Sequence, residues 1–166
     1  MKTHLPAFFK TVIVLIFVGT MTVLAQVQAQ PFSLKPLALS QAGPDISANG
    51  LVTVAMIYQP DCSWCKKQGK ILERAFKQCK KSINIALVGT KGNTRQLRKE
   101  LKHYHEDIPA FIASRKFLRD IGGYQASPTT LIYNEEGKLI VKKRGFIPDQ
   151  KLASALAVIS KDACHI

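Results

Sequence analysis

The chain has 166 residues, 24 Lys and Arg against 11 Asp and Glu, and a formal net charge of +13. This length is enough for one domain with its own core. The basic residues are spread along the chain and interleaved with apolar positions, which argues against the clustered basic face of a nucleic-acid-binding protein. Attraction to anionic phospholipids or to acidic client proteins fits this charge better.

The N-terminal segment has the pattern of a secretory signal. Lys2 and Lys10 charge its start, residues 11–25 are largely apolar, and Ala29 offers a small residue at the cut. We expect cleavage after Ala29, giving a signal peptide over residues 1–29 and an exported, periplasmic protein. The alternative is an uncleaved membrane anchor through residues 11–25, but that stretch is short for a span of about 20 residues.

The next elements predict a strand–helix–strand unit. Residues 30–50 are rich in Pro and Gly and are interpreted as a lead-in tether. Residues 51–58 form an apolar run, as in a strand covered on both faces. Residues 66–80 have the periodicity of an amphipathic helix, and residues 83–88 form a second apolar strand. A right-handed parallel crossover is the expected connection.

The following segment predicts two helices. The first starts near Thr94 and carries Leu97, Leu101, Tyr104 and Ile108 on one face. It stops at residues 107–109, where Pro109 enters the first turn of the second helix. The buried face of that second helix would carry Phe111, Leu118 and Ile121, and Gly122 and Gly123 would end it.

The C-terminal third predicts a hairpin and a helix. Residues 129–133 and 139–143 are β-rich and are separated by a loop containing Gly137. Asp149 is expected to cap a final helix with Leu152, Leu156 and Ile159 on the core side. The whole pattern indicates an α/β fold, a mixed sheet with helices on both faces, over residues 51–166.

The candidate site is Cys62-Ser63-Trp64-Cys65, between the first strand and its helix. Backbone N–H groups and the macrodipole at a helix N-terminus stabilise a thiolate at Cys62, and Cys65 lies close enough to form a disulfide with it. Ser63, Trp64 and the charge of Lys66 would tune the Cys62 thiolate. Four cysteines allow three pairings, and the sequence alone does not choose between them, although spacing favours Cys62 with Cys65.

A zinc site is the main alternative for this motif. It requires two further ligands. His103 and His105 would complete the number of ligands, but we expect the charged helix that carries them to be exposed to solvent. Cys164-His165 is interpreted as a tail. No metal and no cofactor are therefore expected.

The element order, with Cys62-Ser63-Trp64-Cys65 at the first strand–helix junction and Ser127-Pro128-Thr129 opening the hairpin, resembles the thioredoxin superfamily, specifically its exported thiol:disulfide interchange branch. The resemblance covers about residues 51–159. It implies a cis proline at Pro128 facing the cysteines, with Ser127 and Thr129 beside a bound client peptide. It also implies a glycine loop near the active site at residues 142–145.

Three departures qualify the resemblance. Met56 stands where thioredoxin has a buried acid, which argues against fast cytosolic-type reduction. The separation of Cys65 from Pro128 exceeds the minimal spacing, so we expect a helical insertion at about residues 107–123. The lead-in is too short for the dimerisation domain of large periplasmic isomerases, which favours a monomer, and a reductase rather than an oxidase.

The implied activity is thiol:disulfide exchange with client proteins that carry cysteines or disulfides, supported by a membrane or periplasmic redox partner. Cys62 would attack and Cys65 would resolve the mixed disulfide. The thioredoxin arrangement also brings Cys79 and Cys164 to one edge, so we hypothesise a structural disulfide there. A buried free Cys79 with an unpaired Cys164 is the alternative.

A binding module is the competing function. A thioredoxin-like fold could carry Cu(I) on Cys62 and Cys65, or bind a client protein, without redox turnover. Such a copper carrier would usually add an exposed histidine or methionine near the cysteines. Met56 is the nearest methionine, and we expect it to be buried in its strand.

Overall fold

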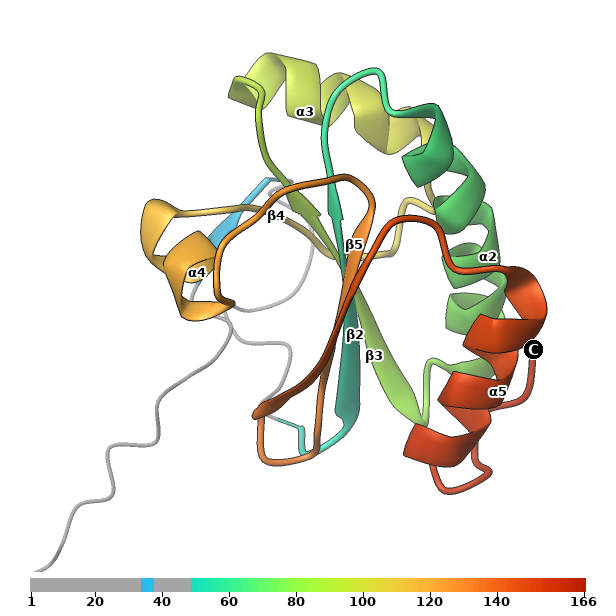
Figure 1. Ribbon diagram of the computed structural model, residues 1–166. Helices are drawn as coiled ribbons and strands as arrows, with labels where there is room; N and C mark the ends of the chain where they lie inside the picture. The colour runs from blue at the N-terminus through green and yellow to red at the C-terminus, as the bar shows by residue number, and fades with distance from the viewer. Residues whose placement is uncertain (1–33, 38–48) are drawn as a thin grey trace, which may run out of the picture.

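The computed structural model describes residues 34–37 and 49–166. The proposed signal peptide, its cleavage site at Ala29 and most of the lead-in segment lie outside the described residues. One six-stranded sheet forms the centre, in the order β1-β4-β3-β2-β5-β6. Parallel and antiparallel pairs both occur in it, and helices lie on both faces (Figure 1). The predicted mixed α/β architecture is therefore confirmed.

The predicted strand–helix–strand unit is present at the centre of the sheet. β2 (Val52–Tyr58) is buried along its whole length and pairs in parallel with β3 (Ile83–Gly89). α2 (Ser63–Cys79) connects them. Its apolar positions, among them Leu72 and Ala75, are fully buried, as the amphipathic pattern predicts.

Alternate residues of β2 build two cores, one on each side of the sheet. Val54 and Met56 pack with the side chains of α2 and α5 (Asp149–Ile159), whereas Ala55 and Ile57 pack with those of α4 (Arg115–Asp120). Figure 1 shows α2 and α5 together on one face and α4 on the other. This two-sided burial explains why β2 has no polar alternation.

The helix predicted to start at Pro109 is wrong over its first half. Residues Ala110–Ile112 form strand β4, which pairs in parallel with β3. The backbone bonds are long-range: Leu87 N–H donates to the Pro109 carbonyl at 2.8 Å. Of the predicted second helix only α4 is helical: Phe117 is buried in it, Leu118 is half-buried, and Ile121, also buried, follows its last residue.

Part of the lead-in segment belongs to the sheet. Lys35–Pro36 form β1, the edge strand, which pairs antiparallel with β4. Leu37 is 0% exposed, and its N–H donates to the Ala110 carbonyl at 2.7 Å. The tether interpretation does not hold for residues 34–37, because they bury side chains and extend the sheet.

Two helix boundaries also differ from the prediction. α3 (Thr94–Glu100) stops early and continues as the 3₁₀ turn η1 (Leu101–His103). The last helix, α5, spans Asp149–Ile159, and its N-cap position is Pro148, which makes no side-chain capping bond. Asp149 lies in its first turn and forms an ion pair with Arg74 of α2, so its carboxylate is engaged there instead of capping.

The hairpin forms as expected. β5 (Thr129–Tyr133) pairs antiparallel with β2 on one side and with β6 (Leu139–Arg144) on the other. Ile57 lies opposite Thr129, so β5 begins where β2 ends. The segment before Thr129 therefore lies at the same end of the strands as the segment that follows β2.

Candidate active site

Cys62 and Cys65 form a disulfide at the N-terminus of α2, with sulfurs 2.06 Å apart. Cys62 is the N-cap, and its Sγ accepts the Cys65 N–H at 3.1 Å. Cys62 is partly exposed, whereas Cys65 is fully buried. No acidic residue occurs in the first turn of α2, so no carboxylate there offsets the positive end of the helix dipole, which can stabilise a thiolate at Cys62.

The Ser127–Pro128 peptide bond is cis, as the resemblance implies. Pro128 immediately precedes β5, so it lies at the sheet edge from which the Cys62 loop leaves β2. Its carbonyl accepts the N–H of Gly145 at 2.8 Å. The Ser127 hydroxyl bonds the Tyr124 hydroxyl, which also donates to Gln59 at 3.0 Å. The segment around Pro128, the proline loop, is thus hydrogen-bonded to Gly145 of the glycine loop after β6 and, through Tyr124, to Gln59 after β2.

The loop between β6 and α5 is attached to the first turns of α2. The rings of Trp64 and Phe146 lie 5.3 Å apart, and Ile147 N–H donates to Gln68 Oε1 at 2.7 Å. Trp64 remains 52% exposed, and Ser63 is exposed beside it. The structure therefore brings the cysteine motif, the proline loop and the glycine loop together at one end of the molecule.

Lys66 is paired with a carboxylate. Its ammonium lies 3.7 Å from the carboxylate of Glu100, which is 6% exposed. Burial first, and then the negative charge of Glu100, raise the pKa of Tyr104 well above its ordinary range. We did not single out Glu100 from the sequence. The sequence indicates its burial only through its position three residues after Leu97, on the apolar face of α3.

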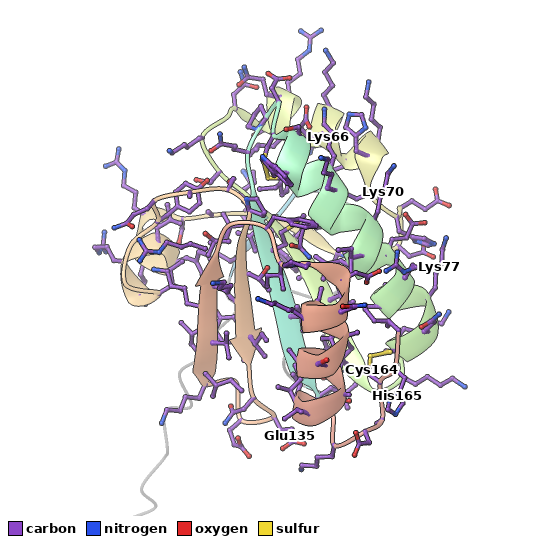
Figure 2. All side chains as sticks on the ribbon, turned by 45° about the vertical axis from the view of Figure 1, so that its right-hand side comes forward. Lys66, Lys70, Lys77, Glu135, Cys164 and His165 are labelled. Carbon is purple, nitrogen blue, oxygen red and sulfur yellow. A yellow bond between two sulfur atoms is a disulfide. The ribbon has the colours of Figure 1, made fainter. Side chains whose placement is uncertain are left out.

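The second disulfide joins Cys79, at the end of α2, to Cys164 after α5. Their sulfurs are 2.08 Å apart, and both residues are buried (Figure 2). The 17 residues of α2 separate this bond from Cys62 by about 25 Å. The four cysteines thus form one disulfide at each end of the helix, one partly exposed and one buried.

His105, one of the histidines considered as a zinc ligand, has other contacts. His105 packs against the Phe76 ring at 5.3 Å, and its Nδ1 accepts the Asp107 N–H at 3.2 Å. In the part of the chain that the structure describes, no three His, Cys, Asp or Glu side chains are grouped to hold a metal. Met56 is fully buried. None of the described helices is long and apolar enough to span a bilayer.

Comparison by sequence finds no relative: no protein-family model matches the chain, and no curated protein does. Solved structures do match. DsbF from Mycobacterium tuberculosis superposes with a TM-score of 0.65 at 15% identity, over 80% of this chain and 96% of that one. A secreted M. tuberculosis disulfide oxidoreductase gives 0.62 at 16% identity, over 81% and 99%.

A thiol:disulfide interchange protein from Chlorobium tepidum has a TM-score of 0.60 at 12% identity, over 67% of this chain and 81% of that chain. At such identities the likeness concerns the fold. The cis proline, the strand order and the disulfide at the start of α2 agree with it. The chain therefore has the thioredoxin fold.

Proposed function

We propose that this protein is a thiol:disulfide oxidoreductase that exchanges disulfides with client proteins through Cys62 and Cys65. The observation that carries the proposal is the asymmetry of the pair: Cys62, at the N-cap, is partly exposed, whereas Cys65 is fully buried. Solved proteins of the same fold are named for disulfide interchange, which supports this function.

The exchange proceeds in two displacements. The Cys62 thiolate attacks one sulfur of a client disulfide, forms a mixed disulfide and releases the first client thiolate. The Cys65 thiolate then attacks Cys62 Sγ, restores the Cys62–Cys65 disulfide and releases the second client thiolate. The client gains two electrons and the dithiol loses them. A redox partner in the membrane or periplasm must reduce the pair again.

We propose the reducing direction. A strongly oxidising pair owes its potential to a strongly stabilised thiolate in its reduced form. Here the Cys65 N–H donates to Cys62 Sγ, but the Lys66 ammonium is paired with Glu100 and the Lys67 ammonium is held over the Trp64 ring. We therefore infer that the Cys62 thiolate is not strongly stabilised, which favours the reducing direction. Ser63 and Trp64 are the intervening residues that tune this balance.

The client lies, in this proposal, along Ser127, Pro128 and Thr129, beside the exposed face of Trp64. We further propose an exported, periplasmic monomer whose signal peptide is cleaved after Ala29. The N-terminal charge and apolar pattern supports export. The buried Cys79–Cys164 bond also fits an oxidising compartment, where such disulfides persist.

A redox titration tests the function. The purified protein is equilibrated in glutathione buffers of graded ratio, and reactive thiols are counted by alkylation and mass. Trp64, the single tryptophan of the chain, reports the same transition by fluorescence. We expect a reversible two-thiol transition, absent in Cys62→Ser, with a midpoint below the glutathione couple. A midpoint above the glutathione couple would indicate an oxidase or isomerase instead of a reductase.

Absence of any transition would contradict redox exchange. The competing function would then be a binding module that carries Cu(I) or a client protein. Copper retained through purification and lost in Cys62→Ser would support the copper carrier, because Cu(I) prefers thiolate ligands.

A further inference from the structure

Two lysines are seated on aromatic rings at the rim of the candidate active site. Lys67 Nζ lies 4.3 Å from the centre of the Trp64 ring, and Lys91 Nζ lies 5.1 Å from the centre of the Tyr124 ring. A cation over a ring keeps its charge while losing part of its freedom. These two charges are therefore better fixed than those of fully extended surface lysines.

The two lysines lie on different sides of the Cys62 loop. Trp64 contacts Phe146, which packs against the core between the sheet and the α2–α5 layer. Tyr124 packs against the core on the α4 face and is bonded to Gln59, three residues before Cys62. A polypeptide approaching Cys62 would meet one fixed positive charge on each side.

Neither lysine has a carboxylate partner among the described residues. Most other close lysine–carboxylate contacts lie elsewhere: Lys77 with Glu73, Lys116 with Asp120 and Lys161 with Glu135. At the rim, Glu100 is taken by Lys66, and Asp61 is the exposed carboxylate next to Cys62. Figure 2 shows Lys66 and Lys70 along the same helix. Because Lys66 and Glu100 offset each other, Lys67 and Lys91 outnumber Asp61, and positive charge exceeds negative charge at the rim.

We infer that the polypeptide that exchanges disulfides with Cys62 carries acidic residues on both sides of its reactive cysteine, and that Lys67 and Lys91 bind them. This inference rests on the proposed redox function and adds the chemical class of the partner. Opposite charges on two partners accelerate encounter and select the partner. The fixed positions of the two ammonium groups reduce the ordering needed on binding.

Exchange kinetics with model disulfides test the inference. The protein, with Cys62 and Cys65 reduced, is mixed with two peptides that share one disulfide and differ only in flanking Glu or flanking Lys residues. Hydroxyethyl disulfide, which is small and uncharged, measures the reaction without docking. Trp64 fluorescence follows each reaction at low and at high salt.

We expect the Glu peptide to react about tenfold faster than the Lys peptide at low salt, and the ratio to approach one at high salt. The double substitution Lys67→Gln and Lys91→Gln should lower the rate ratio of the Glu peptide to hydroxyethyl disulfide about fivefold. The matched control is Lys81→Gln with Lys138→Gln, two exposed lysines at the opposite edge, which should keep the wild-type ratio.

Equal rates for the two peptides at low salt, with normal reaction of hydroxyethyl disulfide, would overturn the inference and leave the redox function intact. Failure to react with hydroxyethyl disulfide would instead remove the redox function on which the inference rests. Sedimentation with anionic phospholipid vesicles, lost in the double variant and unaccompanied by peptide discrimination, would replace the acidic polypeptide by a lipid surface.

Discussion

Removing the Cys79–Cys164 disulfide should destabilise the domain strongly while leaving the candidate active site in place. The bond closes a loop of 85 residues, for which the chain-entropy model gives about 4.5 kcal/mol at 25 °C. The perturbation is Cys79→Ala with Cys164→Ala. The matched control is Cys62→Ala with Cys65→Ala, whose loop of 3 residues gives only about 1.5 kcal/mol.

The assay is urea denaturation of both variants and the wild type under non-reducing conditions, followed by circular dichroism. The free energy of unfolding should fall about three times as far in the first variant as in the control. Cys79 and Cys164 are both buried, whereas Cys62 of the control pair is partly exposed, so lost packing adds to the difference instead of offsetting it. Equal losses in the two variants would refute the loop-closure reasoning.

Three further predictions concern the buried tyrosines and Gly69. Tyr104→Phe should be neutral or stabilising by about 1 kcal/mol, because its buried hydroxyl has no hydrogen-bond partner among the described residues. Tyr58→Phe should instead destabilise by about 1 kcal/mol, because it loses the hydrogen bond to the Leu97 carbonyl, and chemical denaturation compares the two variants. Burial raises the pKa of Tyr58, Tyr104 and Tyr133, so their contribution to stability is complete below pH of about 10 and declines above it by up to about 4 kcal/mol per pH unit for all three, which melting curves from pH 8 to 11 would check. Gly69→Ala would place a Cβ 2.4 Å from the Tyr104 ring and should cost about 1–3 kcal/mol in unfolding free energy; an unchanged value would contradict the close packing there.

The central part of the fold could be predicted because its signals are local and strong. The apolar run that forms β2 and the amphipathic pattern of α2 define the crossover without reference to distant residues. β4 could not be found in this way. It has three residues, and its partners lie in β3 and in Lys35–Pro36, far away in the sequence. Pairing with these two strands overrides any helical preference after Pro109.

The candidate site shows the same division. Cys62, Cys65 and Pro128 could be located from motif and order, because each adjoins a recognisable element. The ion pair of Lys66 with Glu100 could not, because both side chains occur in segments dense with charge that we expected to be solvated. The ring contacts of Lys67 and Lys91 depend on loop positions that spacing does not encode.

The most direct test of the central claim is trapping of a mixed disulfide on one defined cysteine. Cys65→Ser, with its Cys62 thiol reduced, is incubated with a model disulfide peptide and its mass is measured after proteolysis; Cys62→Ser is the comparison. The account predicts a peptide adduct that accumulates on Cys62 in Cys65→Ser, and little or none in Cys62→Ser, because Cys65 is buried. An adduct formed equally on Cys65, or on neither cysteine, would contradict it.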